Sequence, residues 1–189
     1  MCDAASPAVV GIFISFRITA LMRWIAVAVP IVIACIAALL LSQQKVLWHV
    51  TEPGMTLADV RAVLPDAVPP AQPRSLGNGL SLGLVAPGVS NLDRAFDAEL
   101  YFDDDGLQQV LLHPTRLLAE TAAMREFDEL RQAAARRYGR ELPGISTPSA
   151  GVLAEARWKA GPVAITLRVE RRGALAAVTM TYAAARDLS

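Results

Sequence analysis

The longest apolar run of the chain lies near its N-terminus. Residues 24–41 read WIAVAVPIVIACIAALLL, eighteen positions without a charged side chain. At about 1.5 Å per residue, a helix of this length approaches the roughly 30 Å thickness of a bilayer core. Pro30 lies inside the run, but proline is tolerated better in membrane helices than in soluble ones. The pattern therefore predicts a transmembrane anchor over residues 24–41.

The flanking charges predict the orientation of this anchor. Arg17 and Arg23 precede the run, whereas only Lys45 follows it closely. Because an excess of positive charge marks the cytoplasmic side, we expect residues 1–23 in the cytoplasm. The rest of the chain is then outside the inner membrane, which in a bacterium means the periplasm. The residues expected at the membrane interfaces are Trp24, Trp48 and Arg23.

Two other interpretations of the N-terminus stay open. A cleaved signal peptide shares the basic start, although its apolar centre has only about 7 to 15 residues and ends at small residues. A lipoprotein would use Cys35, although six further apolar residues follow that cysteine. A start at Met22 would make residues 1–21 an upstream extension of the reading frame, with unchanged topology.

Beyond a juxtamembrane linker over residues 42–53, the pattern predicts a folded domain over residues 54–185. Its first helix begins at Thr56, where Asp59 three residues later completes a capping-box pattern. Pro65 ends this helix, and the turn-rich stretch that follows, to residue 79, predicts a loop. The apolar face of the helix consists of Leu57, Val60 and Leu64.

Alternating apolar residues predict strands in the first half of the domain. Leu80, Leu82 and Leu84 alternate with smaller residues and are followed by a turn signal at Pro87-Gly88. A hairpin follows, whose loop is formed by residues 104–106 if Gly106 takes a left-handed conformation. Its register places Leu100 opposite Val110, and Ala98 opposite Leu112, on one face. The opposite face carries Glu99, Tyr101 and Asp103.

The apolar spacing changes to that of a helix over residues 115–138, and Gly139 is expected to end it. A segment around Trp158 and two alternating segments, 163–169 and 176–182, then predict three more strands. A turn at Arg172-Gly173 would pair the last two strands, with Val169 opposite Ala176 and Leu167 opposite Val178.

This order of elements predicts the fold class. One helix and about three strands occur twice, and a sheet with one apolar face needs helices to cover that face. We therefore expect an α+β domain with an antiparallel sheet and two helices packed on one face. The order also suggests two αβββ units in tandem.

The charge balance, the positions of the cysteines and the spacing of the histidines argue against nucleic-acid binding, an internal disulfide and a metal site. From residue 42 onward, 16 lysines and arginines oppose 17 aspartates and glutamates, so no excess positive charge predicts nucleic-acid binding. Both cysteines, Cys2 and Cys35, precede the domain, which therefore has no internal disulfide. His49 and His113 stand apart from any metal-ligand spacing, so we predict neither a metal nor a cofactor.

Two short patterns suggest chemistry but are explained better by local structure. The aspartates at residues 103–105 lack the spacing of a calcium loop, whose twelfth position, a glutamate, would fall on Pro114. Residues 79–83 read GLSLG and match GxSxG, which in an α/β-hydrolase places the serine between a strand and a helix. Here the pattern around Ser81 is that of a strand throughout. We therefore predict a hairpin turn and no catalytic residue.

The segment GMTLADV at residues 54–60, continuing to Leu64-Pro65, resembles the GMT-x-x-x-V-x-x-x-L opening of small bacterial envelope proteins of the SmpA/OmlA (BamE-like) family. The member of that family in the outer-membrane barrel-assembly machinery is a non-enzymatic lipoprotein with helices packed on an antiparallel sheet. The resemblance therefore implies an α+β envelope domain without catalysis. This chain departs from the pattern in having Leu-Pro where Leu-Gly is usual.

The sequence thus predicts a single-pass inner-membrane protein whose periplasmic domain binds another envelope protein or a peptide. The residues interpreted as either core or partner contacts are Trp158, Tyr182 and Tyr101. A small apolar ligand between helix and sheet, lined by the first two, is one alternative. The other is a small envelope hydrolase or inhibitor-like module at the cell wall, for which Ser81, Glu99 and Asp103 are the available residues.

Overall fold

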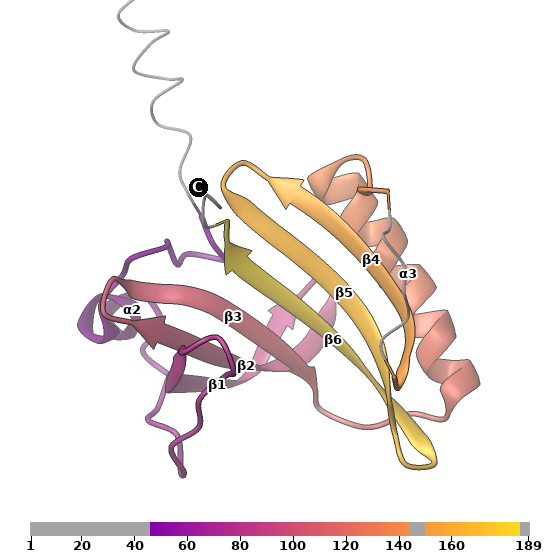
Figure 1. Cartoon of the computed structure of the whole chain (residues 1–189), viewed down its shortest axis with the longest axis horizontal. Coiled ribbons are helices and arrows are strands. Elements are labelled where there is room, and N and C mark those ends of the chain that lie inside the picture. Colours follow the sequence, from indigo (N-terminus) through magenta and orange to yellow (C-terminus); the bar gives the residue numbers. More distant parts are fainter. Residues whose placement is uncertain (1–45, 144–149, 186–189) are drawn as a thin grey trace, which may run out of the picture. The chain divides into compact units, whose positions relative to one another are not determined.

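Six strands form one antiparallel sheet in the computed structural model, which describes residues 46–143 and 150–185. The strands are β1 (Ser81–Asn91), β2 (Arg94–Asp103), β3 (Gly106–Pro114), β4 (Val152–Ala160), β5 (Val163–Arg172) and β6 (Leu175–Ala184). Their order across the sheet is β1-β2-β3-β6-β5-β4 (Figure 1), so each half is a three-stranded meander and the last strands of the two halves pair at the centre.

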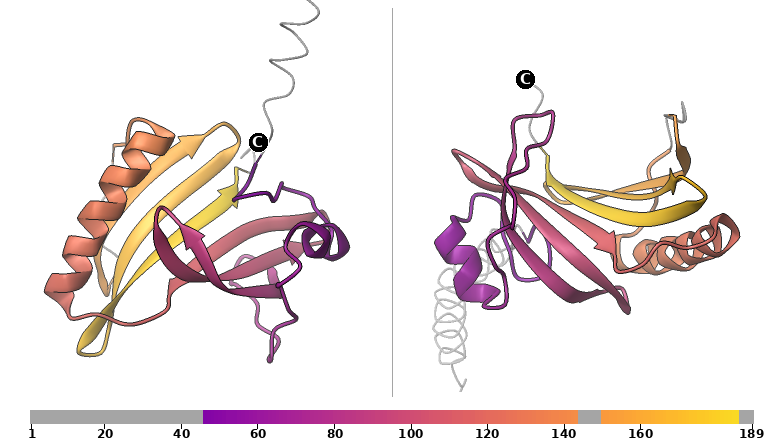
Figure 2. Two further views of the ribbon diagram at one scale, coloured as in Figure 1. Left: turned by 180° about the vertical axis from the view of Figure 1, so that it is seen from behind. Right: turned by 90° about the horizontal axis from the view of Figure 1, so that it is seen from below.

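Two helices complete the domain, α2 (Leu57–Val63) and α3 (Glu120–Tyr138). Helix α3 contacts β4, β5 and β6 (Figure 2), and its buried side chains belong to the same apolar cluster as Val60 of α2. The predicted α+β class and antiparallel sheet are confirmed, and one helix followed by three strands does occur twice in the chain.

Helix α2 begins where its capping box predicts. The Thr56 hydroxyl accepts a hydrogen bond from the Asp59 amide at 3.2 Å, and the Asp59 carboxylate accepts one from the Thr56 amide at 3.0 Å. These bonds satisfy two of the amides that a helix start leaves unpaired. Val60 is the one fully buried residue of this short helix.

Helix α3 starts at Glu120, five residues later than predicted. The backbone of Leu118 exchanges two hydrogen bonds with Ala176 of β6, at 3.0 and 2.8 Å, which keeps the preceding segment extended. The C-terminal end at Gly139, with φ of +86°, agrees with the prediction. The buried side chains of α3 are those of Ala123, Phe127, Leu130 and Ala134.

The turn predicted at Pro87-Gly88 is wrong. Strand β1 continues through these residues as a bulge between Ala86 and Val89, and the hairpin turn lies at Leu92-Asp93, whose φ angles are +48° and +60°. Proline is compatible with this position because β1 is an edge strand. The Gly88 amide donates to the Asp97 carboxylate at 2.9 Å, which fixes the bulge.

The three consecutive aspartates form a turn, as predicted. Ala98 pairs with Leu112 and Leu100 with Val110, as predicted. Asp103 pairs with Gly106, so the loop is Asp104-Asp105, two residues where three were predicted. A bulge then brings Phe102 opposite Leu107, so the apolar face continues to the end of the hairpin.

The second predicted hairpin exists, but its register is shifted by two residues. Val169 pairs with Val178 and Leu167 with Met180, around a Gly173-Ala174 turn. Because a shift of two leaves every side chain on the same face, the apolar alternation alone could not distinguish the two registers. Gly173, with φ of +66°, supplies the positive φ that the first residue of a type II′ turn requires.

The segment predicted as a juxtamembrane linker belongs in part to the folded domain. Leu47, Trp48 and Thr51 are buried, and the Thr51 amide donates to the Trp48 carbonyl at 2.9 Å. Trp48 therefore packs in the core and not at a membrane interface. No helix within 46–143 or 150–185 is long and apolar enough to cross a membrane. The predicted anchor, with Trp24 and Arg23, lies outside the described residues.

Residues of the GMT segment are joined to the start of β3. The Gly54 amide donates to the Leu107 carbonyl at 2.9 Å, and the Leu107 amide donates to the Met55 carbonyl at 2.8 Å. A Cβ atom on Gly106, which has φ of +98°, would lie 2.4 Å from the Gly54 carbonyl oxygen. The close approach of these two backbones therefore requires glycine at residue 106.

We expect Gly106→Ala to destabilise the protein by about 2 to 4 kcal/mol, because it adds a backbone clash to the cost of a left-handed alanine. Gly79→Ala is the matched control, since Gly79 has φ of +86° and a Cβ atom added there would meet no other atom within 4 Å. It should cost only about 1 kcal/mol. Urea denaturation of the full-length protein measures both, and equal losses would contradict the packing argument.

Candidate functional site

The aromatic residues predicted as partner contacts are all buried. Trp158 and Tyr182 lie in the core cluster shared with α3, whereas Tyr101 belongs to a second cluster with Leu80 and Leu82. The indole nitrogen of Trp158 has no hydrogen-bond partner among the described residues. Their positions fit the core-packing interpretation, and a partner would reach Trp158 or Tyr182 only after α3 moved.

Tyr182 is the centre of a buried polar network. Its hydroxyl lies 2.9 Å from the Tyr138 hydroxyl and 3.0 Å from the Asn91 amide nitrogen. Burial, and then the neighbouring Tyr138, raise the pKa of Tyr182 well above its usual range. The network joins the end of β1 to β6 and to the C-terminal turn of α3, so its function is structural.

The three residues considered for a hydrolase, Ser81, Glu99 and Asp103, do not lie together in one site. Ser81 pairs with Phe102 and therefore lies on the opposite face of the sheet from Glu99. Its hydroxyl lies 3.3 Å from that of Ser75. Asp103 accepts a hydrogen bond from the Asp105 amide at 3.0 Å, as expected within a turn. This arrangement does not place a base beside the serine.

Glu99 instead is a buried carboxylate that forms an ionic cluster with three other side chains, of which Arg74 is 59% exposed. Its carboxylate accepts a hydrogen bond from the Tyr101 hydroxyl at 2.7 Å and lies 2.9 Å from Nε2 of His113. Arg74 lies 2.8 Å from the other oxygen. Sequence reasoning missed this cluster, although it predicted Glu99, Tyr101 and the pairing register that brings β2 beside β3.

The neighbours of Glu99 explain its ionisation. Burial alone would raise the pKa of Glu99, but hydrogen bonds from Tyr101 and His113, with the charge of Arg74, lower the pKa below its ordinary value. Burial, and then the Glu99 carboxylate, raise the pKa of Tyr101 to about 12. The cluster thus holds a charged carboxylate whose two oxygens are both occupied, which favours a structural function.

The Glu99 cluster fastens the long loop before β1 to the sheet. Arg74 comes from that loop, and its carbonyl accepts a hydrogen bond from the Leu82 amide at 2.8 Å. Val68 of the same loop exchanges two further backbone hydrogen bonds with Val85. The loop therefore pairs with part of the outer edge of β1.

The face of β3, β6, β5 and β4 opposite α3 is here called the open face. Its part over β3, β6 and β5 carries a hollow of about 300 Å³. No helix covers it among the described residues. The lining residues are Gln109, Leu111, Thr166, Arg168, Glu170, Thr179 and Thr181. These side chains are mostly hydrogen-bonding and come from three adjacent strands, so the hollow is suited to a polar ligand.

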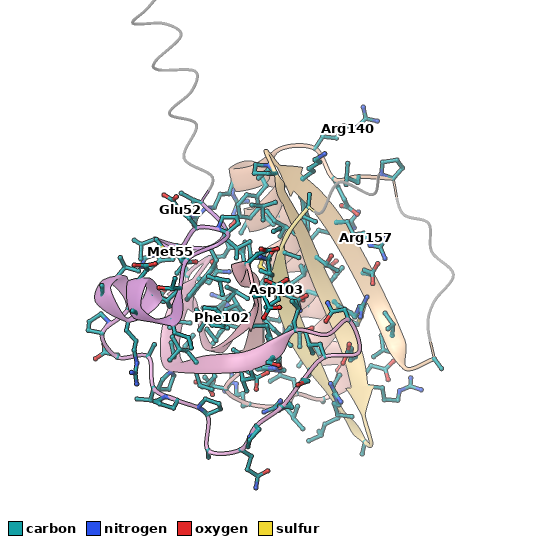
Figure 3. The ribbon with its side chains drawn as sticks, turned by 60° about the vertical axis from the view of Figure 1, so that its left-hand side comes forward. Glu52, Met55, Phe102, Asp103, Arg140 and Arg157 are labelled. Carbon is teal, nitrogen blue, oxygen red and sulfur yellow. The ribbon has the colours of Figure 1, made fainter. Side chains whose placement is uncertain are left out.

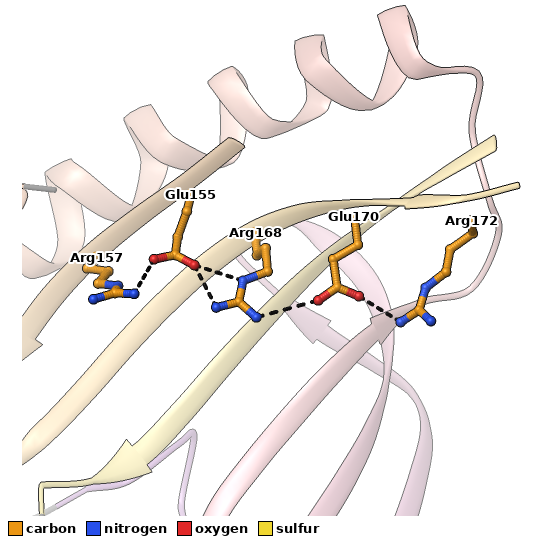
Figure 4. A network of polar contacts seen from close by, with 5 residues as sticks. All are labelled: Glu155, Arg157, Arg168, Glu170 and Arg172. Carbon is orange, nitrogen blue, oxygen red and sulfur yellow. Dashed lines mark hydrogen bonds and ion pairs between the residues drawn. The ribbon is translucent and has the colours of Figure 1, made fainter. Parts of the chain in front are cut away.

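A row of alternating charges, here called the charge ladder, crosses the open face beside this hollow (Figure 4). Glu155 binds Arg157 through one oxygen, at 2.5 Å, and Arg168 through the other, at 2.6 Å. Arg168 also lies 3.5 Å from Glu170, which binds Arg172 at 2.7 Å. The five side chains lie on the side of β4 and β5 away from α3.

Sequence reasoning also missed the ladder, although its signal is visible there. Acidic and basic residues alternate at every second position, over 155–157 and again over 168–172. Side chains two residues apart lie on the same face of a strand. The two sets of charged side chains therefore come into contact when β4 and β5 pair. Partial burial acts to raise the pKa of Glu155, but Arg168 and then Arg157 lower it below its ordinary value.

The described residues offer no metal site, since no group of three or more His, Cys, Asp and Glu side chains among them could hold an ion. His49 has a φ of +55° and its ring lies beside Trp48, whereas His113 belongs to the Glu99 cluster.

Comparisons with protein-family models, with curated proteins and with solved structures gave no match for this chain.

We expect Glu99→Gln to destabilise the protein by about 2 kcal/mol at pH 7, because Arg74 and His113 lose a buried partner. The lowered pKa of Glu99 means that its contribution is present above its ordinary value of 4.5 and is lost as the pH falls through the lowered pKa. The difference between the parent protein and the variant should therefore shrink in acid.

Urea denaturation at pH 7 and at acidic pH measures this difference. Glu126→Gln on α3 is the control, and it should change the free energy of unfolding by less than about 0.5 kcal/mol. A Glu99→Gln difference that stays constant into acid would show that the charge of Glu99 is not what stabilises the cluster.

Proposed function

We propose that this protein is a non-enzymatic binding module of the bacterial envelope, which holds another protein or a peptide on the open face of its sheet. In this proposal residues 24–41 anchor it in the inner membrane and the domain lies in the periplasm. The order of one helix and three strands, repeated once, supports the interpretation of two αβββ units in tandem.

The observation that carries the proposal is the hollow on the open face. An antiparallel sheet often exposes one polar face to water, so exposure alone would not favour binding. Here the exposed strands form a hollow of about 300 Å³ with hydrogen-bonding side chains, including Thr166 and Thr181, around it. Polar groups in a concave surface orient a ligand, and their predominance here favours a peptide or protein partner over an apolar small molecule.

The edges of the sheet favour binding on the face over binding at an edge. The Val68 backbone pairs with β1 on one side, and the Leu142 amide donates to the Arg157 carbonyl of β4 at 2.8 Å on the other. An added strand would have to displace these bonds. A partner can approach the open face without breaking backbone pairing.

A photoreactive amino acid placed at Thr181 of the full-length protein, expressed in its own cells, tests the proposed site. We expect a specific crosslink to an envelope protein after irradiation, identified by mass spectrometry. The same group placed at Asp128, an exposed position of α3, is the control and should give no such product. Equal crosslinking from both positions, or none from Thr181, would contradict a binding site on the open face.

The predicted topology has its own test. A reporter that is active only outside the cytoplasm, fused after Ser189, should be active because the anchor places the domain in the periplasm. A fusion with a reporter that is active only in the cytoplasm is the control. Activity of that second fusion would contradict the periplasmic location.

A further inference from the structure

The open face of β4 and β5 carries a local excess of positive charge in a domain that is neutral as a whole. Ala156 and Trp158 of β4, and Ile165 and Leu167 of β5, are buried toward α3, so the alternate positions lie on the open face. The charged residues at these positions are Glu155, Arg157, Lys159, Arg168, Glu170 and Arg172. Four basic and two acidic side chains give this strip a net charge of +2.

The carboxylates of the charge ladder are already occupied. Both oxygens of Glu155 bind arginines, one binding Arg157 and the other Arg168, and both oxygens of Glu170 do the same with Arg168 and Arg172. A cationic ligand would therefore have to displace an arginine from either glutamate.

The arginines at the two ends of the ladder are the accessible groups. The side chains of Arg157 and Arg172 are 46% and 55% exposed, whereas those of Glu155 and Glu170 are 23% and 26% exposed. The nitrogen of each end arginine that lies nearest to its glutamate is Nη2, at 2.5 Å for Arg157 and 2.7 Å for Arg172. Figure 3 shows Arg157 well away from Phe102 and Asp103 of β2.

These groups define the chemistry of a ligand. A guanidinium presents five N–H donors and binds a carboxylate through two parallel hydrogen bonds. The hollow adjoins the ladder on the β6 side, since Arg168 and Glu170 also line it, and there the hydroxyls of Thr166, Thr179 and Thr181 can donate to and accept from peptide groups. The open face therefore combines carboxylate recognition at the two ends of the ladder with hydrogen bonding in the adjacent hollow.

We infer that the open face binds an acidic, extended peptide segment of the partner, with carboxylates on Arg157 and Arg172 and its backbone over the threonines. This inference rests on the proposed function and names the chemistry of its ligand. A short acidic segment matches a strip of net charge +2. A long polyanion such as a nucleic acid would extend beyond it over a surface without excess positive charge, since residues 42–189 contain 16 basic and 17 acidic residues.

Fluorescence anisotropy with the full-length protein in detergent tests the inference. The probes are a labelled peptide of four Glu-Ser repeats, the same peptide with glutamine in place of glutamate, and a labelled single-stranded oligonucleotide. We expect the Glu-Ser peptide to bind more tightly than both other probes. Added salt should weaken this binding, because the contacts are charge-assisted and partly exposed.

Variants then assign the binding to the two arginines. The double substitution Arg157→Gln with Arg172→Gln should weaken binding of the Glu-Ser peptide about tenfold, as expected for two partly exposed ion pairs. Arg157→Lys with Arg172→Lys keeps the charge but loses the two parallel hydrogen bonds, so it should bind more tightly than the double glutamine variant and less tightly than the parent protein. The control is Arg125→Gln on α3, an exposed arginine off the open face, which should leave binding unchanged.

Several results would overturn the inference. These are equal binding of the glutamate and glutamine peptides, tighter binding of the oligonucleotide, or unchanged binding by the folded double glutamine variant. If Thr181 crosslinks to an envelope protein while the acidic peptide shows no preference, the acidic-peptide inference fails and the proposed binding function stands. If neither crosslinking nor peptide binding occurs, both fail.

Discussion

The pairing of β3 with β6 is the interaction on which the rest of the structure depends. It joins strands that are distant in the sequence, with Gln109 opposite Ala183 and Leu112 opposite Met180. Because Val110 and Leu112 share one face with Met180 and Tyr182, this pairing makes the apolar faces of the two halves continuous. The main core, which is shared by both halves, covered by α3 and reached by Val60 of α2, follows from it.

The same pairing forms the open face on which we place the proposed partner. With α3 on one face, the polar residues of β3, β6 and β5 are brought together on the other, and the hollow is formed from strands of both halves. The charge ladder then follows from the β4–β5 register, which places Glu155 opposite Arg168. The pairings along β1 and the Leu142 bond at β4 cover parts of the sheet edges, which is why the proposed partner is placed on the open face.

The sequence predicts features that depend on neighbouring residues, and it fails where distant contacts decide. The capping box at Thr56 and the hairpin around Asp104-Asp105 are local, and both are confirmed. The Pro87-Gly88 dipeptide favours a turn, yet pairing with β2 keeps β1 extended through it. The position of Trp48 after the apolar run predicts a membrane interface, whereas tertiary packing places this residue in the core. Glu99, His113 and Arg74 meet only after β2, β3 and the preceding loop have assembled, so no spacing in the sequence could show their cluster.

Hydrogen–deuterium exchange of the full-length protein, resolved to single amides, tests most directly the claim that both halves share one core through β3 and β6. The amides of Leu111 and Thr181, which are opposite each other in this pairing, should be among the slowest to exchange and should require the same free energy of opening. Exchange of β1–β3 at a clearly lower free energy than β4–β6 would contradict the account, because it would show that the two halves unfold separately.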